Sequence, residues 1–576
     1  MKQTARIIVS LTGIAAMVAA GSWAWAQTDD NPLGRRDGDG FTLSATVNQT
    51  PGQKPVALSL PANLSRAYTA EQLFAVGGVM WGKGAADRVQ ARRDAGIPLA
   101  QTLAHYVEQI RGGNNYLRAV QQIHPGLAKA AVGGGAAGSA AATTPARGRV
   151  LPMDEMVVLF DRSIPVAGMS TSLGSGALKE LSATRDSQVA ARLTAAGAVI
   201  LGHTNGDELH GLVGSHLPAG YSWLGGQVVD ARDALWRSPG HGATGAAVAM
   251  AAGWADLAVV YGTPQQITEP AAIAGLYAAV LPRRCGIQGA VPAVGPQGHL
   301  GIIGRTPEDV ALGQLVLCRS GIDTTNHAGD GGREDTTAAG TADSASTDST
   351  TDTGTTVGAR NSQPAGVKVT ARRPRSAART LTLVSAEDDP HIINAGKAHN
   401  LLFIPPTAQM NDLRRALADL PLDAATRVLG AQELDGWLAA QKKGPAGLTE
   451  LAAFYADHPQ QAPYGHDLID AVADGREMSV DQAHAVVAEA EKLNRQLADL
   501  VRGAGAEGMM ERGLGPFPLA DADATRITVP FGEVNPNLAG DAYGDLSFVV
   551  TAFGRDSDEV AFTATRRLAD GRADRF

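Results

Sequence analysis

The chain has 576 residues, of which 44% are apolar and only 5% aromatic, so it can build a large core that packs mainly through small side chains. Its formal net charge is −9, which lacks the basic excess that binding to nucleic acid or to an anionic membrane requires. The expected partner is therefore a small molecule or a protein, of unknown identity, and not a nucleic acid.

The first 26 residues are expected to be a signal peptide. Lys2 and Arg6 precede an apolar run over residues 7–20, and Ala24-Trp25-Ala26 gives the small-x-small pattern of a cleavage site before Gln27. The apolar run is short for a permanent anchor, so we expect no membrane span in the mature chain. The protein is then exported, to the periplasm or the medium; the alternative is an uncleaved anchor.

A polar leader, residues 27–60, is expected to be held loosely because Pro and Gly interrupt it. From about Ala67 to Ala131 the pattern is helical, and a Gly- and Ala-rich tract follows at 131–148. Within the helical pattern, the stretch LAQTLAHYVEQI places five bulky residues on one face: Leu99, Leu103, Tyr106, Val107 and Ile110.

Two short apolar runs, VVLF (157–160) and AVIL (198–201), are typical of buried strands, and helix-like segments lie between and after them. This alternation predicts an α/β fold in which helices cover a sheet. The two cysteines, Cys285 and Cys318, are compatible with a disulfide in an exported protein or with two buried thiols, because the sequence does not show whether they lie close together.

The composition changes abruptly after Cys318. Residues 324–366 contain scarcely any large apolar residue and cannot bury enough surface to fold, so a disordered insertion is expected over 321–378. It divides one fold into a first part, 61–320, and a second part, 379–576. The second part is expected to hold a long helical region, Met410–Val501, and strands at ITVPFG (527–532) and LSFVVTAFG (546–554).

Several stretches, taken in order, resemble the amidase signature family. They are SIPVAGMSTSLGSGAL (163–178), AAGAVILGHTNGDEL (195–209), LGGQVVDARDALWRSPGHGATGAAVAMAAG (224–253), ITEPAAIAG (267–275), ITVPFG (527–532) and GDLSFVVTAFGRDSDEVAF (544–562). The resemblance runs from about Ala67 to near the C-terminus. It implies the amidase signature fold, an α/β arrangement in which a mixed twisted sheet is flanked by helices on both faces.

The resemblance also implies a catalytic triad, and all three of its positions are substituted here. In the family a nucleophilic serine attacks an amide, a second serine on a cis peptide relays its proton, and a buried neutral lysine is the base. Asp161 stands at the lysine position, Gly242 at the relay serine and Gln266 at the nucleophile. Pro264 has no N–H to donate to an oxyanion, so the turn before the nucleophile is altered too.

Residues near these positions suggest a hypothesis of a replacement catalytic site. His241 adjoins Gly242 and could pair with Asp161, and Thr244 or Thr268 could then act as the nucleophile. An ordinary hydrogen-bonded histidine and a solvated or paired aspartate is the favoured interpretation.

A metal site is a further hypothesis for the histidine-rich stretch that holds His203, Asp207, Glu208, His210 and His216, with His241 further on. Glu208 and His210 cannot share a helical face, although His203 and Asp207 could. The zinc-protease pattern HExxH does not occur, and Asn205 and Glu208 are positions that the family usually keeps. We therefore expect a structural role for this stretch, with no metal and no cofactor.

Two classes of function follow from these residues. The favoured one is a pseudoenzyme, a non-catalytic protein that binds a ligand or partner through the cleft that holds the active site in the family, or through its surface. The other is an amide-bond hydrolase with a rearranged active site, and a cell-envelope protein tethered by the insertion is a weaker third.

Overall fold

The protein was analysed as a computed structural model, which describes residues 58–573 except for 62–63, 65–66, 81–83, 128–150, 232–237, 286–289, 319–378, 387–389, 513–523, 533–545 and 554–555. The expected signal peptide, the Gly- and Ala-rich tract, the whole insertion and almost all of the leader lie outside these residues. In the part of the chain described, no helix is long and apolar enough to cross a bilayer.

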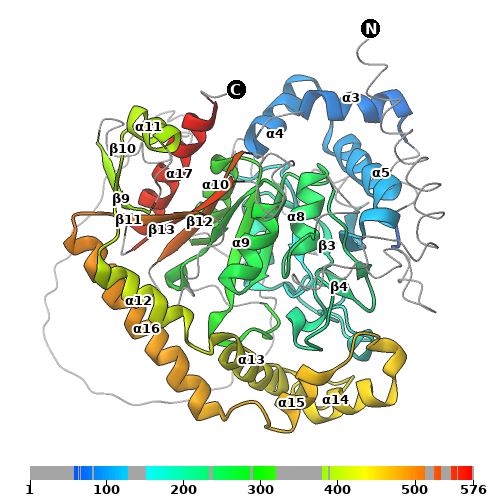
Figure 1. Cartoon of the computed structure of the whole chain (residues 1–576). Helices are drawn as coiled ribbons and strands as arrows, with labels where there is room; N and C mark the ends of the chain where they lie inside the picture. Colours follow the sequence, from blue (N-terminus) through cyan, green and yellow to red (C-terminus); the bar gives the residue numbers. More distant parts are fainter. Residues whose placement is uncertain are drawn as a thin grey trace, which may run out of the picture.

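A mixed sheet of eleven strands forms the centre of the molecule (Figure 1). In spatial order the strands are β1 (Val120–Ile123), β3 (Val199–Thr204), β2 (Val157–Asp161), β6 (Leu257–Gly262), β8 (His299–Gly304), β7 (Tyr277–Val280), β12 (Thr525–Gly532), β13 (Leu546–Ala552), β11 (Gly508–Arg512), β9 (Leu381–Val384) and β10 (Leu401–Ile404). A two-stranded ribbon, β4 (Tyr221–Ser222) and β5 (Gly226–Gln227), stands apart from it. The expected α/β fold is confirmed.

Both parts of the chain contribute to this one sheet. The strand β7 of the first part pairs antiparallel with β12 of the second, with Val280 opposite Arg526 and Ala278 opposite Thr528. The sheet therefore continues across the position of the insertion, as the single-fold interpretation requires.

Helices cover both faces of the sheet. On one face lie α5 (Leu99–Leu117), α8 (Thr244–Ala251) and α9 (Pro264–Ile273); on the other lie α7 (Gln188–Ala195), α10 (Pro307–Cys318) and α17 (Ser557–Ala573). The strand β2 shows why: Val157 and Leu159 enter the first core, and Val158 and Phe160 enter the second. A strand buried on both faces has a continuous apolar sequence, which is the pattern that predicted it.

The remaining helices frame this core. They are α3 (Ala70–Met80), α4 (Ala85–Asp94), α11 (Pro390–Ala398), α12 (Ala408–Ala418), α13 (Leu422–Ala439), α14 (Leu448–Asp457), α15 (Asp467–Ala473) and α16 (Val480–Gly503). Short 3-10 turns are η2 (Gly176–Leu178), η3 (Glu208–Gly211), η4 (Arg283–Cys285), η5 (Gly295–Gln297) and η7 (Pro459–Gln461). Together α12 to α16 make up the expected helical region, and they form an arm along one side of the molecule (Figure 1).

One part of the helical prediction is wrong. The pattern from Ala67 to Ala131 predicts helix throughout, but α5 ends at Leu117 and the edge strand β1 follows. Arg118 adopts a left-handed conformation, with φ of 52°, and the Asn114 side chain binds both the N–H and the C=O of Val120 at 2.8 Å. These contacts end the helix and begin the strand. The spacing of the apolar residues does not predict them. The five residues predicted to share a face of α5 are all buried.

A buried charged cluster fixes the N-terminal helices to the sheet. The Asp256 carboxylate accepts hydrogen bonds from Arg88 and Arg92 of α4, from the Tyr106 hydroxyl of α5 and from the Val157 N–H of β2. The guanidinium groups of Arg92 and Arg88 hold the pKa of Asp256 well below its usual range despite its complete burial.

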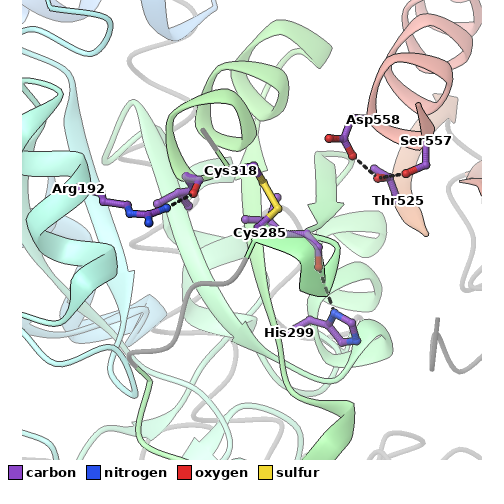
Figure 2. Close-up of a disulfide and its surroundings, with 9 residues drawn as sticks. Arg192, Cys285, His299, Cys318, Thr525, Ser557 and Asp558 are labelled. Atoms are coloured by element: carbon purple, nitrogen blue, oxygen red, sulfur yellow. Dashed lines mark hydrogen bonds between the residues drawn. A yellow bond between two sulfur atoms is a disulfide. The ribbon is translucent and has the colours of Figure 1, made fainter. Parts of the chain in front are cut away.

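The two cysteines form a disulfide, which settles the alternative that the sequence left open (Figure 2). Their Cα atoms are 4.4 Å apart. The bond joins Cys285, just after β7, to Cys318, at the end of α10 and directly before the insertion. Beside it the Arg192 side chain donates to the Leu317 carbonyl at 2.8 Å, which holds the same helix end against α7.

Candidate active site

The loop SPGHGATG and the helix α8 that follows it pack without room for larger side chains. A Cβ on Gly245 would lie 2.3 Å from the carbonyl oxygen of Asn205 and 2.4 Å from that of Ala119. In the loop, Gly242 has a φ of +95°, which is strained for any residue with a side chain. The glycines are therefore required by close packing and backbone conformation.

The Gln266 side chain is used to cap a helix. The stretch PQQITEP (264–270), in which the resemblance places the nucleophile position and the turn before it, forms the first two turns of α9, and Thr263 is its N-cap. The carboxamide oxygen of Gln266 accepts from the Thr263 N–H at 3.0 Å, and its Nε2 donates to the His210 carbonyl at 3.0 Å. Both ends of the carboxamide are thus bound to backbone groups.

Gly242 and Gln266, the relay and nucleophile positions, lie against each other. The Ala243 N–H donates to the Gln266 carbonyl at 2.9 Å, and a Cβ on Gly242 would lie 2.3 Å from the Gln266 Cβ. The structure therefore brings together the two positions that the resemblance assigns to the relay and the nucleophile.

Asp161 ends strand β2 and is buried. Its Oδ1 accepts from the N–H of Ser163 at 2.9 Å and from the Ser163 hydroxyl. The negative charge of Asp161 opposes the effect of burial on two neighbouring histidines, His203 and His210, whose pKa values burial nevertheless lowers. A carboxylate therefore stands where the resemblance places a neutral lysine.

The amidase family model matches residues 114–323. The chain is 34% identical over 178 residues to a subunit of the glutamyl-tRNA(Gln) amidotransferase of Symbiobacterium thermophilum, covering 30% of this chain and 35% of that protein. It is 31% identical over 189 residues to the corresponding protein of Thermus thermophilus, covering 33% and 36%. The matched segments thus span about a third of the length of these curated relatives.

Solved structures extend the likeness of fold over most of the chain. The peptide amidase of Stenotrophomonas maltophilia superposes with a TM-score of 0.66 at 20% identity, covering 85% of this chain and 97% of that one. An amidase family protein of Bacillus anthracis superposes with a TM-score of 0.67 at 17% identity, covering 89% and 96%. The chain belongs to the amidase signature family. Its fold is the amidase signature fold.

In this member of the family, a histidine–aspartate pair lies at the loop before α8. The His241 Nδ1 is 3.0 Å from Oδ2 of Asp207, and not beside Asp161 as the imagined replacement site would have it. Asp207 is almost fully buried and also accepts from the N–H groups of Gly220 and Gly242. Its carboxylate raises the pKa of His241 to about 9, although about half of the His241 side chain is exposed to solvent.

The two threonines considered as nucleophiles are held by backbone carbonyls. The Thr244 hydroxyl donates to the Gly240 carbonyl at 3.0 Å, and the Thr268 hydroxyl donates to the Pro264 carbonyl at 2.9 Å within α9. Both side chains are completely buried. Because each hydroxyl points to a carbonyl inside the fold, neither is placed to attack a substrate.

The histidine-rich stretch does not gather as a metal site. His203 lies on strand β3 and its Nε2 contacts the Ile164 carbonyl, so the helical face suggested for His203 and Asp207 does not exist. His210 lies in a left-handed turn, and in the described part of the chain no three His, Cys, Asp or Glu residues come together as metal ligands would.

Asn205 and Glu208 act structurally, as predicted. Asn205 binds Arg162, the Ser222 hydroxyl and the Arg118 carbonyl. The Glu208 Oε1 accepts from the Tyr455 hydroxyl at 2.6 Å, and burial raises the pKa of Glu208 to about 7 against these hydrogen bonds.

Two contacts in this region could not be predicted from the sequence. The sequence does not indicate Asp207 as the partner of His241, and it does not point to Tyr455 at all. No local pattern links Tyr455 to Glu208, a residue 247 positions away.

Proposed function

We propose that this protein is an exported pseudoenzyme of the amidase family, which binds a small-molecule or protein ligand without hydrolysing it. One observation carries the proposal: where the family has its nucleophile, the Gln266 carboxamide is bound to the Thr263 N–H and the His210 carbonyl. A carboxamide cannot be deprotonated at neutral pH and does not attack an amide.

The neighbouring positions support the same conclusion. Gly242 offers no hydroxyl to relay a proton, and Asp161 is an acceptor held by Ser163. Pro264 at the first turn of α9 has no N–H, so it cannot help to stabilise an oxyanion. Loss of a single oxyanion donor costs about 3–4 kcal/mol of transition-state stabilisation, and here the nucleophile, relay and base are replaced as well.

Export is the second half of the proposal, and the pattern of residues 1–26 supports it. Mass spectrometry of the protein recovered from the cell envelope or the medium is expected to give an N-terminus at or near Gln27. Recovery of intact Met1 from that fraction would refute cleavage.

The absence of catalysis is tested by measuring hydrolysis of primary amides, anilides, peptide amides and short peptides by the purified mature protein. Labelling by a serine-reactive fluorophosphonate probe is measured as well. We expect no turnover and no labelling. The matched control is Gln266→Ser, which restores a hydroxyl at the nucleophile position without a relay or a base and is expected to stay silent. Turnover by the unaltered protein would overturn the proposal.

The alternative, an amide hydrolase with a rearranged site, rests on the His241–Asp207 pair. The carboxylate orients the imidazole through Nδ1, as it does in serine hydrolases, and the exposed ring could activate a water molecule. Because the pKa of His241 is raised to about 9, the ring is protonated at neutral pH and such activity would increase up to that pH. Turnover that rises toward pH 9 and disappears in His241→Ala would favour this alternative.

A further inference from the structure

A cavity lies in the helical arm, away from the candidate active site. It has a volume of about 370 Å³ and is formed where α13 meets the ends of α14, α15 and α16. Its lining residues do not include Asp161, Gly242 or Gln266. The family's triad positions therefore do not account for it.

The walls of this cavity are aliphatic. Val428 of α13, Leu448 of α14, Val472 of α15 and Val480 of α16 face it from four helices. Val480 is a large apolar residue that is 36% exposed, and the other three are buried or half-buried. An alkyl chain entering the cavity would remove apolar surface from water on both sides.

Two carboxylates also line the cavity, Asp435 and Glu477. The Oε1 of Glu477 accepts from the guanidinium of Arg427, while its Oε2 has no hydrogen-bond partner among the described residues. Asp435 accepts from the Leu448 N–H at 2.7 Å through Oδ1. The described lining residues include these two acids and no basic side chain. A buried acceptor without a donor is costly, so this cavity favours a ligand that brings an N–H.

We propose that this cavity binds an alkyl chain that ends in a cationic nitrogen, an alkylammonium or alkylguanidinium group. The chain would contact the four aliphatic residues, and the cation would donate to Oε2 of Glu477, whose Oε1 is bound to Arg427. A free amine and the side chain of a lysine or arginine in a peptide share this chemistry. An alkyl carboxylate of equal length would find acceptors at Asp435 and Glu477 and no basic side chain among the described lining residues.

The experiment measures binding of hexylammonium to the full mature protein by isothermal titration calorimetry, beside hexanol, hexanoate and ammonium ion. We expect saturable millimolar binding of hexylammonium alone. Acetyl-lysine-methylamide and its norleucine counterpart extend the test to a peptide side chain. Binding of the lysine compound at least as tight as that of hexylammonium would indicate a peptide source, and weaker binding a free amine; both agree with the proposal.

Glu477→Gln is expected to weaken hexylammonium binding about tenfold or more, the usual effect of losing a charge-assisted hydrogen bond. The matched control is Glu489→Gln, which removes an exposed acid of α16 that pairs with Lys492 and is expected to bind as the unaltered protein does. Val480→Trp keeps both carboxylates but fills the cavity, so binding should be lost even if Glu477→Gln folds poorly. Equal binding of hexanol, unchanged binding in both variants, or no binding at all would each overturn the proposal.

Discussion

The hydroxyl of Tyr455 donates a hydrogen bond of 2.6 Å to Glu208 and lies 2.6 Å from the hydroxyl of Ser175. All three side chains are buried, and Tyr455 belongs to helix α14 of the helical arm while the other two belong to the sheet-forming part. One phenol therefore fixes the arm against the segments that support the candidate active site. The Glu208 Oε2 accepts in turn from the Trp223 N–H.

Removing this hydroxyl should destabilise the protein. Tyr455→Phe leaves Glu208 and Ser175 buried without their shared partner, at an expected cost of about 1–3 kcal/mol in the free energy of unfolding. Tyr464→Phe is the control, because Tyr464 contacts Tyr221 through its ring, which the change preserves. Chemical denaturation measures both, and equal stability of the two variants would mean that Tyr455 contributes by packing alone.

The close contact at Gly242 predicts that a side chain is not tolerated there. Gly242→Ala adds a Cβ only 2.3 Å from that of Gln266, on a backbone with φ of +95°, and should cost more than about 2 kcal/mol. Gly505→Ala is the control, since Gly505 has φ of +77° and open space around it. The same conformational penalty then applies without the collision, so thermal unfolding of the two variants separates the two effects. Equal losses of stability in the two variants would show that backbone strain alone explains why position 242 requires glycine.

The His241–Asp207 pair predicts a dependence of stability on pH. Because folding raises the pKa of His241 from 6.5 to about 9, its stabilisation is complete below pH 6.5 and is lost as the pH rises through 9. The ring is half exposed, so solvent screening limits the effect to about 1 kcal/mol or less. The difference in unfolding free energy between the unaltered protein and His241→Ala should therefore shrink from about pH 6 to above pH 9. A pH-independent difference for His241→Ala would contradict the prediction.

The Asp256 cluster predicts the largest loss among these substitutions. Asp256→Asn leaves Arg88 and Arg92 buried without their counter-charge, which typically costs about 3–5 kcal/mol. Asp154→Asn breaks a pair with Arg93 that is about one-third exposed and should cost less than about 1 kcal/mol. Urea denaturation compares the stability of the two variants. Similar unfolding midpoints would show that other groups compensate the charges of Arg88 and Arg92 when Asp256 is neutralised.

The continuous sheet predicts the result of cutting the chain within residues 319–378. The fragments should elute together from a size-exclusion column, because β7 of one pairs with β12 of the other and their helices share cores. Mass spectrometry of the intact fragments identifies the cleavage site, and the fragments should separate only when denaturant is added. Separation without denaturant would instead indicate two independent domains.

The parts of the fold that are predictable from sequence are those with local periodicity. The buried face of α5, the strands β2 and β3 and the C-terminal strands β12 and β13 all follow from apolar runs of the right length and period. The strand β1 does not, because a side-chain contact from Asn114 sets the turn before it. Local patterns carry no information about such a contact.

The candidate site shows the same limit. The adjacency of Gly242 and Gln266 follows from the family resemblance, whereas the partner of His241 does not. Asp207 and Asp161 are both acids near a strand end, and only the folded backbone shows that Asp207 lies beside the loop. The helical start of α9, by contrast, does carry a local signal: Thr263 and Gln266 have the spacing of a capping box, and Pro264 occupies the first helical position.

The pairing of β7 with β12 has a consequence for the order in which the molecule is made. In the finished protein β7 is an interior strand, but its partner is synthesised roughly 250 residues later. Until then, one side of β7 presents unpaired N–H and C=O groups, as an edge strand does. The nascent first part is therefore an incomplete sheet in which β7 is a temporary edge strand. Chaperones, or rapid completion of the polypeptide, must keep this edge from pairing with other chains.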